Sequence, residues 1–390
     1  MDSLTGTACS GGPAGPLDGL LVADFSRVLA GPYATMLLGD LGATVIKVEA
    51  PRGDDTRHWG PPWTADGEST YNLSVNRNKR SVVLDLSDPD DHRRALRLVR
   101  RADVVVQNLR LASLQRLGLD YDAVRTNNPG LIYCSITGFG PAAGANLPGY
   151  DLVVQAVSGL MSLTGPDPQT PTKTGIATAD VLTGLHAALG ILAALNARRD
   201  IGEGQLVEVN LMSSMLSGLV NFGGAYALTG DVAHGMGIRH PGICPYEPFE
   251  TKDRLLVIAA ANDRLFASLC VCLGLDELAS DPRFLTNGDR VAHRDELGPL
   301  LGAVLRMRTA DDWFTLLTDA GVPCGPINDV AQGMELAALL GLDPIIDVDG
   351  SAQVAHPVRL SATPASYRHA PPALGSDQEI LTWLDQETST

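Results

Sequence analysis

Two short apolar runs near the amino terminus, LLVADF at Leu20–Phe25 and TVIKVE at Thr44–Glu49, decide the fold class. Each has the length of a strand. Between them, after Gly31-Pro32, residues 34–42 read ATMLLGDLG and show the apolar spacing of a helix. A strand, a helix and a second strand in this order form a βαβ unit whose two strands are parallel. The opening of the chain therefore predicts an α/β fold.

The same alternation continues along the next ninety or so residues. Strand-like runs rich in valine, leucine and isoleucine occur at 81–86, 102–108 and 131–138, with helix patterns at 90–101 and around 114–125 between them. Apolar runs without polar alternation are typical of a parallel sheet that helices cover on both faces. We expect a large domain with a Rossmann-like parallel sheet.

The character of the chain changes after Tyr150. Two helical segments follow, and the second carries apolar side chains that we expect to pack against the sheet, at Leu182, Leu185, Ala188, Leu189, Leu192 and Leu195. A glycine-rich stretch at 223–242 indicates a boundary or a mobile loop. LLVIAA at Leu255–Ala260 then opens a second, smaller α/β unit.

A chain of 390 residues usually exceeds the size of a single core. The expected organisation has four parts along the chain. These are a lead-in at 1–16, a large domain at 17–222, a small domain with a glycine-rich linker at 223–320, and a return to the large domain at 321–390.

Composition excludes several classes of protein. A formal net charge of -16 argues against nucleic acid as a partner, because phosphate backbones are bound by clustered Lys and Arg. The first sixteen residues contain no Lys or Arg and no apolar run, so they match neither a secretory signal nor an Arg-rich transit peptide. Apolar stretches such as 187–195 are short for a membrane span. Six scattered cysteines lack the spacing of a zinc site, and we expect a cytoplasmic protein with reduced thiols.

Several common motifs are absent from the sequence. The segment after the first strand, Ser26–Pro32, lacks the G-x-G-x-x-G fingerprint, and no P-loop, H-E-x-x-H, EF-hand loop or G-x-S-x-G elbow occurs. The sequence therefore gives no support to nucleotide, metal-hydrolase or serine-hydrolase chemistry. We expect no metal and no permanently bound cofactor.

One acidic residue is a candidate for chemistry. Asp180 ends the run TGIATAD, which we place directly before a long amphipathic helix. Free backbone N–H groups and the helix dipole hold an anion at such a position. Asp180 is therefore either a simple helix cap or a carboxylate nucleophile, and periodicity does not distinguish the two.

From Gly15 to about Pro372 the chain resembles the class III CoA-transferase family. The resemblance lies in long ordered segments, among them GDLGATVIKVEAPRGDDTR, NRNKRSVVLDL, YCSITGFGP, GYDLVVQAVSGLMSLTG and GVPCGPIND. In this family the catalytic aspartate lies thirty residues after the Tyr or His of a G-[YH]-[DE] element, and here Asp180 follows Tyr150 at that spacing. The resemblance implies that Asp180 is the covalent nucleophile, and that two chains form an interlocked, ring-like homodimer.

Within the family, GDDTRHWGPPW, STYNLSVNRNKRS and HPGICPYEPFETKD are similar to the segments of transferases that use succinyl-CoA with short dicarboxylates such as glutarate. The implied substrates are an acyl-CoA and a small carboxylic acid. The residues that the resemblance assigns to coenzyme A are Val28, Leu29, Ala30, Leu84, Asn108, Leu109, Arg110, Arg116 and Tyr150. The two arginines would bind phosphate groups.

The implied mechanism acylates Asp180 to a mixed anhydride and then passes coenzyme A through an aspartyl thioester. Backbone N–H groups of a glycine loop would stabilise each oxyanion, with Gly223-Gly224 and Gly235 to Gly237 as candidates and the stretch before Pro241 as a lid. Four arginines are candidates to bind the second carboxylate of a diacid, namely Arg27, Arg52, Arg57 and Arg239.

Three alternatives stay open. An α-methylacyl-CoA racemase or an intramolecular CoA-transfer isomerase would use the same pocket. In the racemases the position of Tyr150 is a histidine that moves the α-proton, and a tyrosine, with an ordinary pKa of roughly 10, is a poor base at neutral pH. A non-catalytic acyl-CoA-binding protein is the third alternative, and Asp180 in its full motif argues against it.

Overall fold

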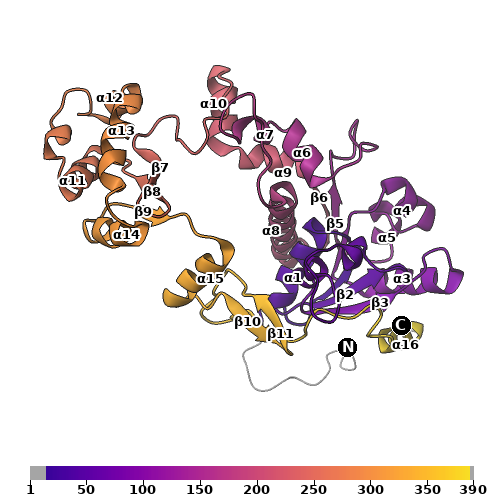
Figure 1. The fold of residues 1–390 in the computed structure, drawn as a ribbon. Helices are drawn as coiled ribbons and strands as arrows, with labels where there is room; N and C mark the ends of the chain where they lie inside the picture. Colours follow the sequence, from indigo (N-terminus) through magenta and orange to yellow (C-terminus); the bar gives the residue numbers. More distant parts are fainter. Residues whose placement is uncertain (1–14, 387–390) are drawn as a thin grey trace. The chain divides into compact units, whose positions relative to one another are not determined.

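In the computed structural model, which describes residues 15–386, six strands form one parallel sheet (Figure 1). In chain order the strands are β1 (Leu21–Asp24), β2 (Thr44–Glu49), β3 (Lys79–Val83), β4 (Val104–Gln107), β5 (Ile132–Thr137) and β6 (Leu206–Asn210). Across the sheet they follow the order β3-β2-β1-β4-β5-β6, and every neighbouring pair is parallel. This is the Rossmann strand order. The predicted α/β fold is confirmed.

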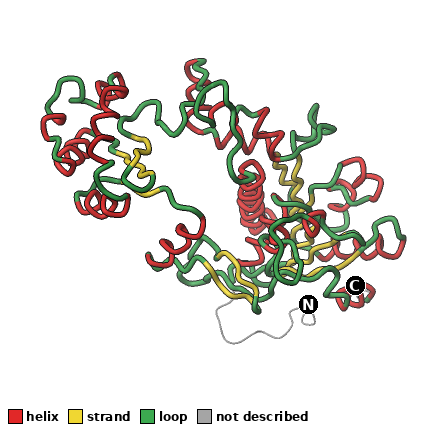
Figure 2. Tube along the Cα trace, in the orientation of Figure 1, coloured by secondary structure: helices red, strands yellow, loops and turns green. Residues whose placement is uncertain are grey.

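Helices cover both faces of this sheet (Figure 2). Side chains alternate along a strand, so Val104 and Val106 of β4 enter one hydrophobic cluster and Val105 enters the other. Helices α1 (Ala30–Asp40) and α8 (Thr178–Ile201) contribute to the first cluster. Helices α3 (Pro89–Arg101), α4 (Leu111–Leu117), α5 (Tyr121–Arg125) and α16 (Glu379–Asp385) contribute to the second.

The sequence explains where these helices begin and end. Asp88 caps α3 by accepting hydrogen bonds from the N–H groups of Asp90 and Asp91, and Pro89 occupies a first-turn position where no N–H is needed. The single helix expected around 114–125 is two helices instead. Gly118 ends α4 in the left-handed region, at φ 59°, and redirects the chain before α5.

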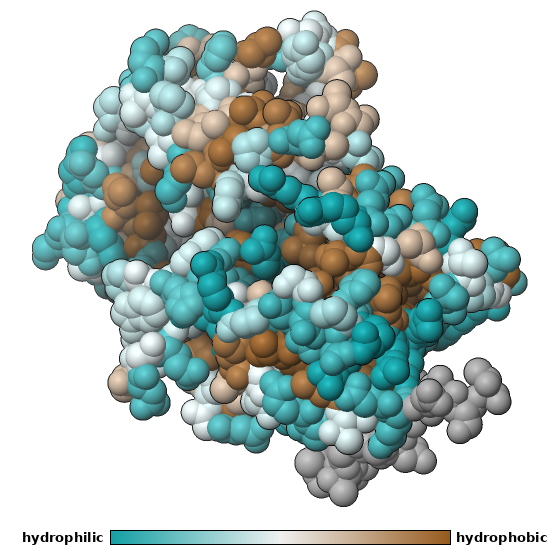
Figure 3. Space-filling view, turned by 90° about the vertical axis from the view of Figure 1, so that its right-hand side faces the viewer, coloured by the Kyte–Doolittle hydropathy of each residue, from teal (hydrophilic) through white to brown (hydrophobic). Residues whose placement is uncertain are grey.

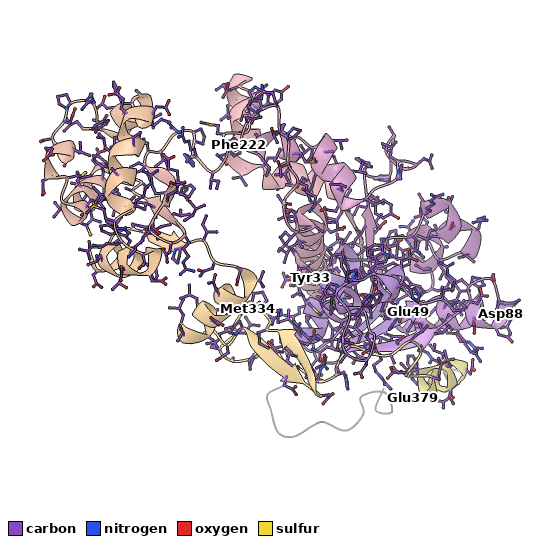
Figure 4. The ribbon with its side chains drawn as sticks, in the orientation of Figure 1. Tyr33, Glu49, Asp88, Phe222, Met334 and Glu379 are labelled. Atoms are coloured by element: carbon purple, nitrogen blue, oxygen red, sulfur yellow. The ribbon has the colours of Figure 1, made fainter. Side chains whose placement is uncertain are left out.

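The buried face of α8 is made of small residues, and this corrects a prediction. Ala179, Gly184, Ala187 and Ile191 are buried, whereas Leu185 is 41% exposed and Leu189 is 65% exposed. Small residues allow α1 and α8 to pack closely. A Cβ atom on Gly184 would lie 2.7 Å from the carbonyl oxygen of Ala30 and 3.1 Å from Cδ1 of Tyr33, which Figure 4 labels. The prediction is wrong for Leu185 and Leu189, which lie on the exposed side. Ala188 is buried in the core, and three further residues pack against it, Leu182, Leu192 and Leu195.

Helix α8 is also the one helix within residues 15–386 that is long and apolar enough to span a membrane by length and composition. The short apolar runs of the sequence had predicted that no helix would pass this test, so the finding differs from the prediction. In the structure, this helix contributes Ala179, Ala187, Ile191 and Ala194 to the core cluster against the sheet. Its apolar composition therefore has a packing explanation.

Four further helices come after strands β5 and β6 in the chain. They are α6 (Asp151–Val157), α7 (Leu160–Leu163), α9 (Leu211–Gly218) and α10 (Val220–Thr229). Gly223 and Gly224 lie inside α10, so the prediction that they form a loop is wrong. A single residue, Leu219, separates α9 from α10.

The chain divides into two compact units. The larger one contains the parallel sheet and extends to Leu160, resumes at Thr174–Asp231 and includes the chain from Asp343 onward. The smaller one consists of Met161–Lys173 and Val232–Leu342. The predicted small domain at 223–320 thus differs at both ends, because α10 belongs to the larger unit and α15 (Val330–Leu339) to the smaller.

The smaller unit has its own sheet and core. Its strands β7 (Tyr246–Glu250), β8 (Leu255–Ala259) and β9 (Cys324–Pro326) are antiparallel. The core helices are α11 (Asp263–Leu273), α13 (Arg294–Leu305) and α14 (Ala310–Asp319).

The remaining elements of the described chain, in both units, are short. They are the 3-10 helices Asp55–His58 and Asp276–Ala279, α2 (Thr70–Leu73), α12 (Asn287–Ala292), β10 (Ile345–Val348) and β11 (Ser351–Val354).

The close approach of α1 and α8 leads to a test by substitution. We expect Gly184→Ala to lower the free energy of unfolding by about 1–3 kcal/mol, because the added methyl group overlaps backbone of α1. The matched control is Gly224→Ala in α10, where a Cβ atom meets nothing within 4 Å and helix propensity favours alanine. Urea unfolding of the two variants measures both values. Equal stability of the two variants would contradict the packing described here.

Candidate active site

Asp180 lies in the first turn of α8. The helix begins at Thr178 with Ala177 as its cap residue, so the position expected directly before the helix is in fact its third residue. The side chain is partly buried. Among the hydrogen bonds of residues 15–386, none involves its carboxylate oxygens. Asp180 is therefore not the cap of its own helix.

The first turn of α8 is capped by a carboxylate from another helix. Oδ1 of Asp151, the first residue of α6, accepts hydrogen bonds from the N–H of Ala179 at 2.8 Å and from the N–H of Asp180 at 3.4 Å. Asp151 thereby uses the N–H groups that would otherwise attract the carboxylate of Asp180. The carboxylate oxygens of Asp180 therefore do not cap the helix.

The surroundings of Asp180 favour its protonated form. Burial is the main cause, and the negative charge of Asp151 adds to it, so that the pKa of Asp180 is raised from 3.8 to about 7. The helix dipole acts in the opposite direction, but it is weaker than these two effects here. A carboxyl group with a pKa near 7 is partly ionised at neutral pH.

Tyr71, in α2, lies in the electrostatic field of the same acidic groups. Burial raises the pKa of Tyr71 to about 12, and the charges of Asp180, Asp151 and Asp54 contribute to the shift. Its ring contacts that of Trp59 edge to face, with the centroids 5.4 Å apart. The phenol therefore stays neutral and keeps its O–H as a hydrogen-bond donor.

The loop after β1 is held by three polar side chains. Val28 has a left-handed backbone, at φ 69°, which is strained for a β-branched residue. Its N–H donates to the carboxylate of Asp54 at 3.2 and 3.3 Å. Lys47 Nζ donates to Asp54 Oδ2 at 3.0 Å and to the carbonyl of Ser26 at 3.1 Å. Asn108 pairs with both backbone groups of Arg27, at 2.9 and 2.8 Å.

Beneath this loop lies a fully buried ion pair. Lys79 Nζ donates to Asp24 Oδ2 at 3.1 Å, and both side chains have no solvent exposure. Burial lowers the pKa of Lys79 to about 8, whereas the pKa of Asp24 is lowered overall by Lys79 and Lys47 in spite of its burial. Removing one partner would leave an unpaired charge in the core, which is strongly destabilising.

A cavity of about 350 Å³ opens at the carboxyl ends of β1, β2 and β3. In an open parallel sheet, ligands bind at this edge. Two of the predicted coenzyme A residues, Leu84 and Leu109, line the cavity together with Phe25, Leu86 and Arg27. Glu49, which Figure 4 labels at the end of β2, also lines it.

The other seven predicted coenzyme A residues are not among those that line the cavity. Val28, Leu29 and Asn108 belong to the loops that follow β1 and β4, and Ala30 is the first residue of α1, all close in sequence to cavity-lining residues without lining the cavity themselves. The remaining three residues do not line the cavity either. Arg110 is the exposed cap residue of α4, Arg116 bonds to its own helix at Ala112 and Ser113, and Tyr150, 63% exposed, precedes α6.

Two of the four arginines expected to bind a second carboxylate already have partners. Arg57 makes a bidentate pair with Glu49, at 2.8 and 2.7 Å, and Arg239 bonds to Glu247 and Asp295. The guanidinium groups of these two are therefore already paired with carboxylates of the chain itself. Arg27 and Arg52 make only long contacts with Asp55, at 3.6 and 3.8 Å, and are largely exposed.

The glycines expected to form an oxyanion site are engaged as well. The N–H of Gly235 donates to the carbonyl of Ser162 at 2.8 Å, and the N–H of Gly237 donates to that of Gly165 at 2.8 Å. A backbone N–H that is already bonded is not available to an oxyanion. The sequence did not predict a role for Tyr71 or Asp151 beside Asp180. The G-[YH]-[DE] element, here Gly149-Tyr150-Asp151, was a signal that could have pointed to Asp151.

Comparisons with known proteins show the family of this chain and agree with its fold. The family model of CoA-transferase family III matches residues 17–378. A succinate–glutarate CoA-transferase of Agrobacterium fabrum is 41% identical, covering 95% of this chain and 96% of that protein. An acetyl-CoA:oxalate CoA-transferase of Acetobacter aceti is 40% identical, covering 90% of each. The crystal structure of a CaiB/BaiF family protein from Brucella suis superposes with a TM-score of 0.88 at 40% identity, covering 95% of this chain and all of that one. The chain belongs to CoA-transferase family III.

Proposed function

We propose that this enzyme transfers coenzyme A from succinyl-CoA to a short dicarboxylate such as glutarate, with Asp180 as the covalent nucleophile. Its family makes it a CoA-transferase that acts on acyl-CoA and carboxylic acid substrates. The names of relatives at about 40% identity support succinate and glutarate as the acids. The observation that carries the proposal is an Asp180 carboxyl group that is partly buried and bears no capping role.

The proposed reaction begins at the thioester of the donor. A carboxylate oxygen of Asp180 attacks the carbonyl carbon, the C–S bond breaks, and coenzyme A leaves as a thiolate, whose ordinary pKa of roughly 8.5 makes it a fair leaving group. The product is an anhydride between Asp180 and the acyl group. The thiolate then attacks the aspartyl carbonyl of this anhydride, which releases the donor acid and leaves an aspartyl thioester.

The second half reverses these steps with the acceptor acid. Its carboxylate attacks the aspartyl thioester and forms a new anhydride, and the released thiolate attacks the acceptor carbonyl. The new acyl-CoA forms and the Asp180 carboxylate is regenerated, so that no proton is consumed overall. Each tetrahedral intermediate carries an oxyanion. Because the phenol of Tyr71 stays neutral near Asp180, we propose it as one hydrogen-bond donor to that oxygen.

Racemase chemistry has less support. It needs a base that takes an α-proton, and the residue at the corresponding position is Tyr150, which is 63% exposed. The partly ionised group of the site is Asp180, and a carboxylate serves transfer without any proton movement. We therefore keep transfer between two acids as the single proposal.

The proposal is tested with a panel of acceptor acids. We expect purified enzyme with succinyl-CoA to form glutaryl-CoA faster than the thioesters of oxalate, mesaconate or monocarboxylates of similar length. The Asp180→Ala variant should lose at least about 10³-fold in kcat, because the nucleophile is gone. Chromatography of the CoA thioesters measures both. Full activity of the alanine variant, or exchange of an α-proton with deuterated water without an acceptor, would overturn the proposal.

The raised pKa of Asp180 gives the reaction a pH dependence. Because only the ionised carboxylate attacks, and ionisation increases as the pH passes the pKa, kcat/KM for the donor should rise with pH and reach half of its maximum near pH 7. Initial rates between about pH 5.5 and 8.5 measure this profile. An ordinary aspartate would give a flat profile over the same range.

We further propose that two chains form the interlocked homodimer that the family resemblance implies. The support is the leucine face of α8, where Leu185 and Leu189 are exposed on the single chain. Figure 3 shows patches of hydrophobic surface, in brown, between hydrophilic regions. Exposed apolar area of this kind is common at interfaces between subunits.

Light scattering tests the dimer. We expect a mass of twice 41.1 kDa, and we expect Leu189→Asp to reduce the dimer fraction because it places a charge in an apolar contact. A monomeric mass of the unaltered protein at micromolar concentration would contradict the proposal.

We also keep a cytoplasmic location as a proposal. Within the part of the chain that the structure describes, Cys134, Cys244, Cys270, Cys272 and Cys324 are free thiols. Unpaired cysteines support a reducing compartment.

A further inference from the structure

One buried glutamine connects the two segments that position Asp180. Gln155 lies one helical turn after Asp151 on α6 and is 1% exposed. Its Nε2 donates to Asp151 Oδ2 at 2.7 Å and to the carbonyl of Ile176 at 3.3 Å. Its Oε1 accepts the N–H of Thr174 at 3.0 Å and lies 3.1 Å from the hydroxyl of Thr174.

These partners fix the orientation of the amide. Asp151 and the carbonyl of Ile176 are acceptors, so they require the NH₂ group on their side, and the N–H of Thr174 requires the oxygen. A flipped amide would set its oxygen against a carboxylate. Gln155 is therefore a fully used, directional link between α6 and the segment that enters α8.

The link leads directly to the nucleophile. Gln155 holds Oδ2 of Asp151, which leaves Oδ1 to bind the N–H groups of Ala179 and Asp180. It also holds residues 174–176, from which α8 starts two residues later. Both the cap of the first turn and the chain that enters it depend on this one side chain.

We propose that Gln155 is a positioning residue for acyl transfer, which holds the Asp151 carboxylate against the first turn of α8 and thereby fixes the place and the charged surroundings of Asp180. The inference rests on the proposed function and adds a residue to it. Gln155 contacts Asp151 and the segment at 174–176, and it acts on the reacting atoms through them.

The charges around Asp180 give the proposal a directional consequence. Asp151 is the titratable group that acts on Asp180, and Asp151, Asp54 and Asp180 itself act on the neighbouring Tyr71. Loss of the amide donor frees the Asp151 carboxylate to move away from the first turn of α8, so its charge acts less strongly on Asp180. An added carboxylate at position 155 has the opposite effect.

The experiment uses Gln155→Met and Gln155→Glu in the full-length enzyme. For Gln155→Met we expect kcat to fall about 10- to 100-fold, because a displacement of the nucleophile of order 1 Å has this cost. KM for succinyl-CoA should change less than about threefold, since the cavity lining does not include α6. The pH midpoint of kcat/KM should move down in Gln155→Met and up in Gln155→Glu. The matched control is Gln353→Met, which replaces another buried glutamine, on β11, and should change neither value.

A second measurement of the same midpoint needs no activity. Because the folded-state pKa of Asp180 is raised, ionisation destabilises the fold. Stability relative to an Asp180→Asn variant is therefore lost as the pH rises from about 4 to about 7, and the loss ends at the folded-state pKa. Urea unfolding is measured against pH for Gln155→Met and Gln155→Glu, each with and without Asp180→Asn. The pH at which the loss of stability ends gives the folded-state pKa of Asp180 in each variant. Opposite shifts in the two variants support the proposal, and unchanged midpoints in both overturn it, whatever happens to kcat.

Failure of the proposed function gives a different result. An unaltered enzyme that transfers coenzyme A to no acid of the panel would reject the reaction, while the unfolding measurement would still show whether Gln155 controls the ionisation of Asp180.

Discussion

The contact between the Asp151 carboxylate and the first turn of α8 is the constraint on which the site depends. A helix start presents unpaired N–H groups, and an acidic residue in the first turn would normally be drawn to them. Here a carboxylate from α6 takes two of these N–H groups, at 2.8 and 3.4 Å. Asp180 keeps its oxygens free and lies near a like charge in a partly buried place, and both conditions favour a reactive carboxyl group with a pKa near neutrality.

The sheet supplies the second requirement, which is a rigid edge for the donor. The loop at Ser26–Val28 lies at the carboxyl end of β1 and is tied down by Lys47, Asp54 and Asn108. The lysine and the aspartate are both without solvent exposure, so their pairing is strongly favoured over separation. This arrangement offsets the strain of a left-handed Val28. A loop held in this way is preorganised, and ordering it costs little when a ligand binds.

Local patterns predicted the sheet well, because continuous apolar runs of strand length are properties of the chain itself. The strands around Val105 and the βαβ opening are examples. Periodicity also revealed an apolar stripe on α8, but it could not say that Gly184 and its small neighbours, and not the leucines, face α1. Which face is buried depends on a partner far away in the sequence.

The site was predictable only in part for the same reason. Resemblance pointed to Asp180, whereas its electrostatic neighbours Asp151 and Tyr71 come from positions 29 and 109 residues earlier in the chain. Glycine content suggested a loop at Gly223-Gly224, where the chain is helical in spite of the low helix propensity of glycine. Arg57 was expected to be free to bind a substrate carboxylate. Its guanidinium instead binds Glu49, because a buried carboxylate needs a partner.

The central claim is that the carboxyl group of Asp180 becomes activated during turnover, and trapping measures this most directly. Enzyme incubated with succinyl-CoA is treated with hydroxylamine, which converts an anhydride or thioester of a side chain into a hydroxamate, and peptide mass spectrometry locates the modified residue. The account predicts a hydroxamate on Asp180 that forms only in the presence of the acyl-CoA. An unmodified Asp180 in an enzyme that transfers coenzyme A under the same conditions, or a label on a different residue, would contradict it.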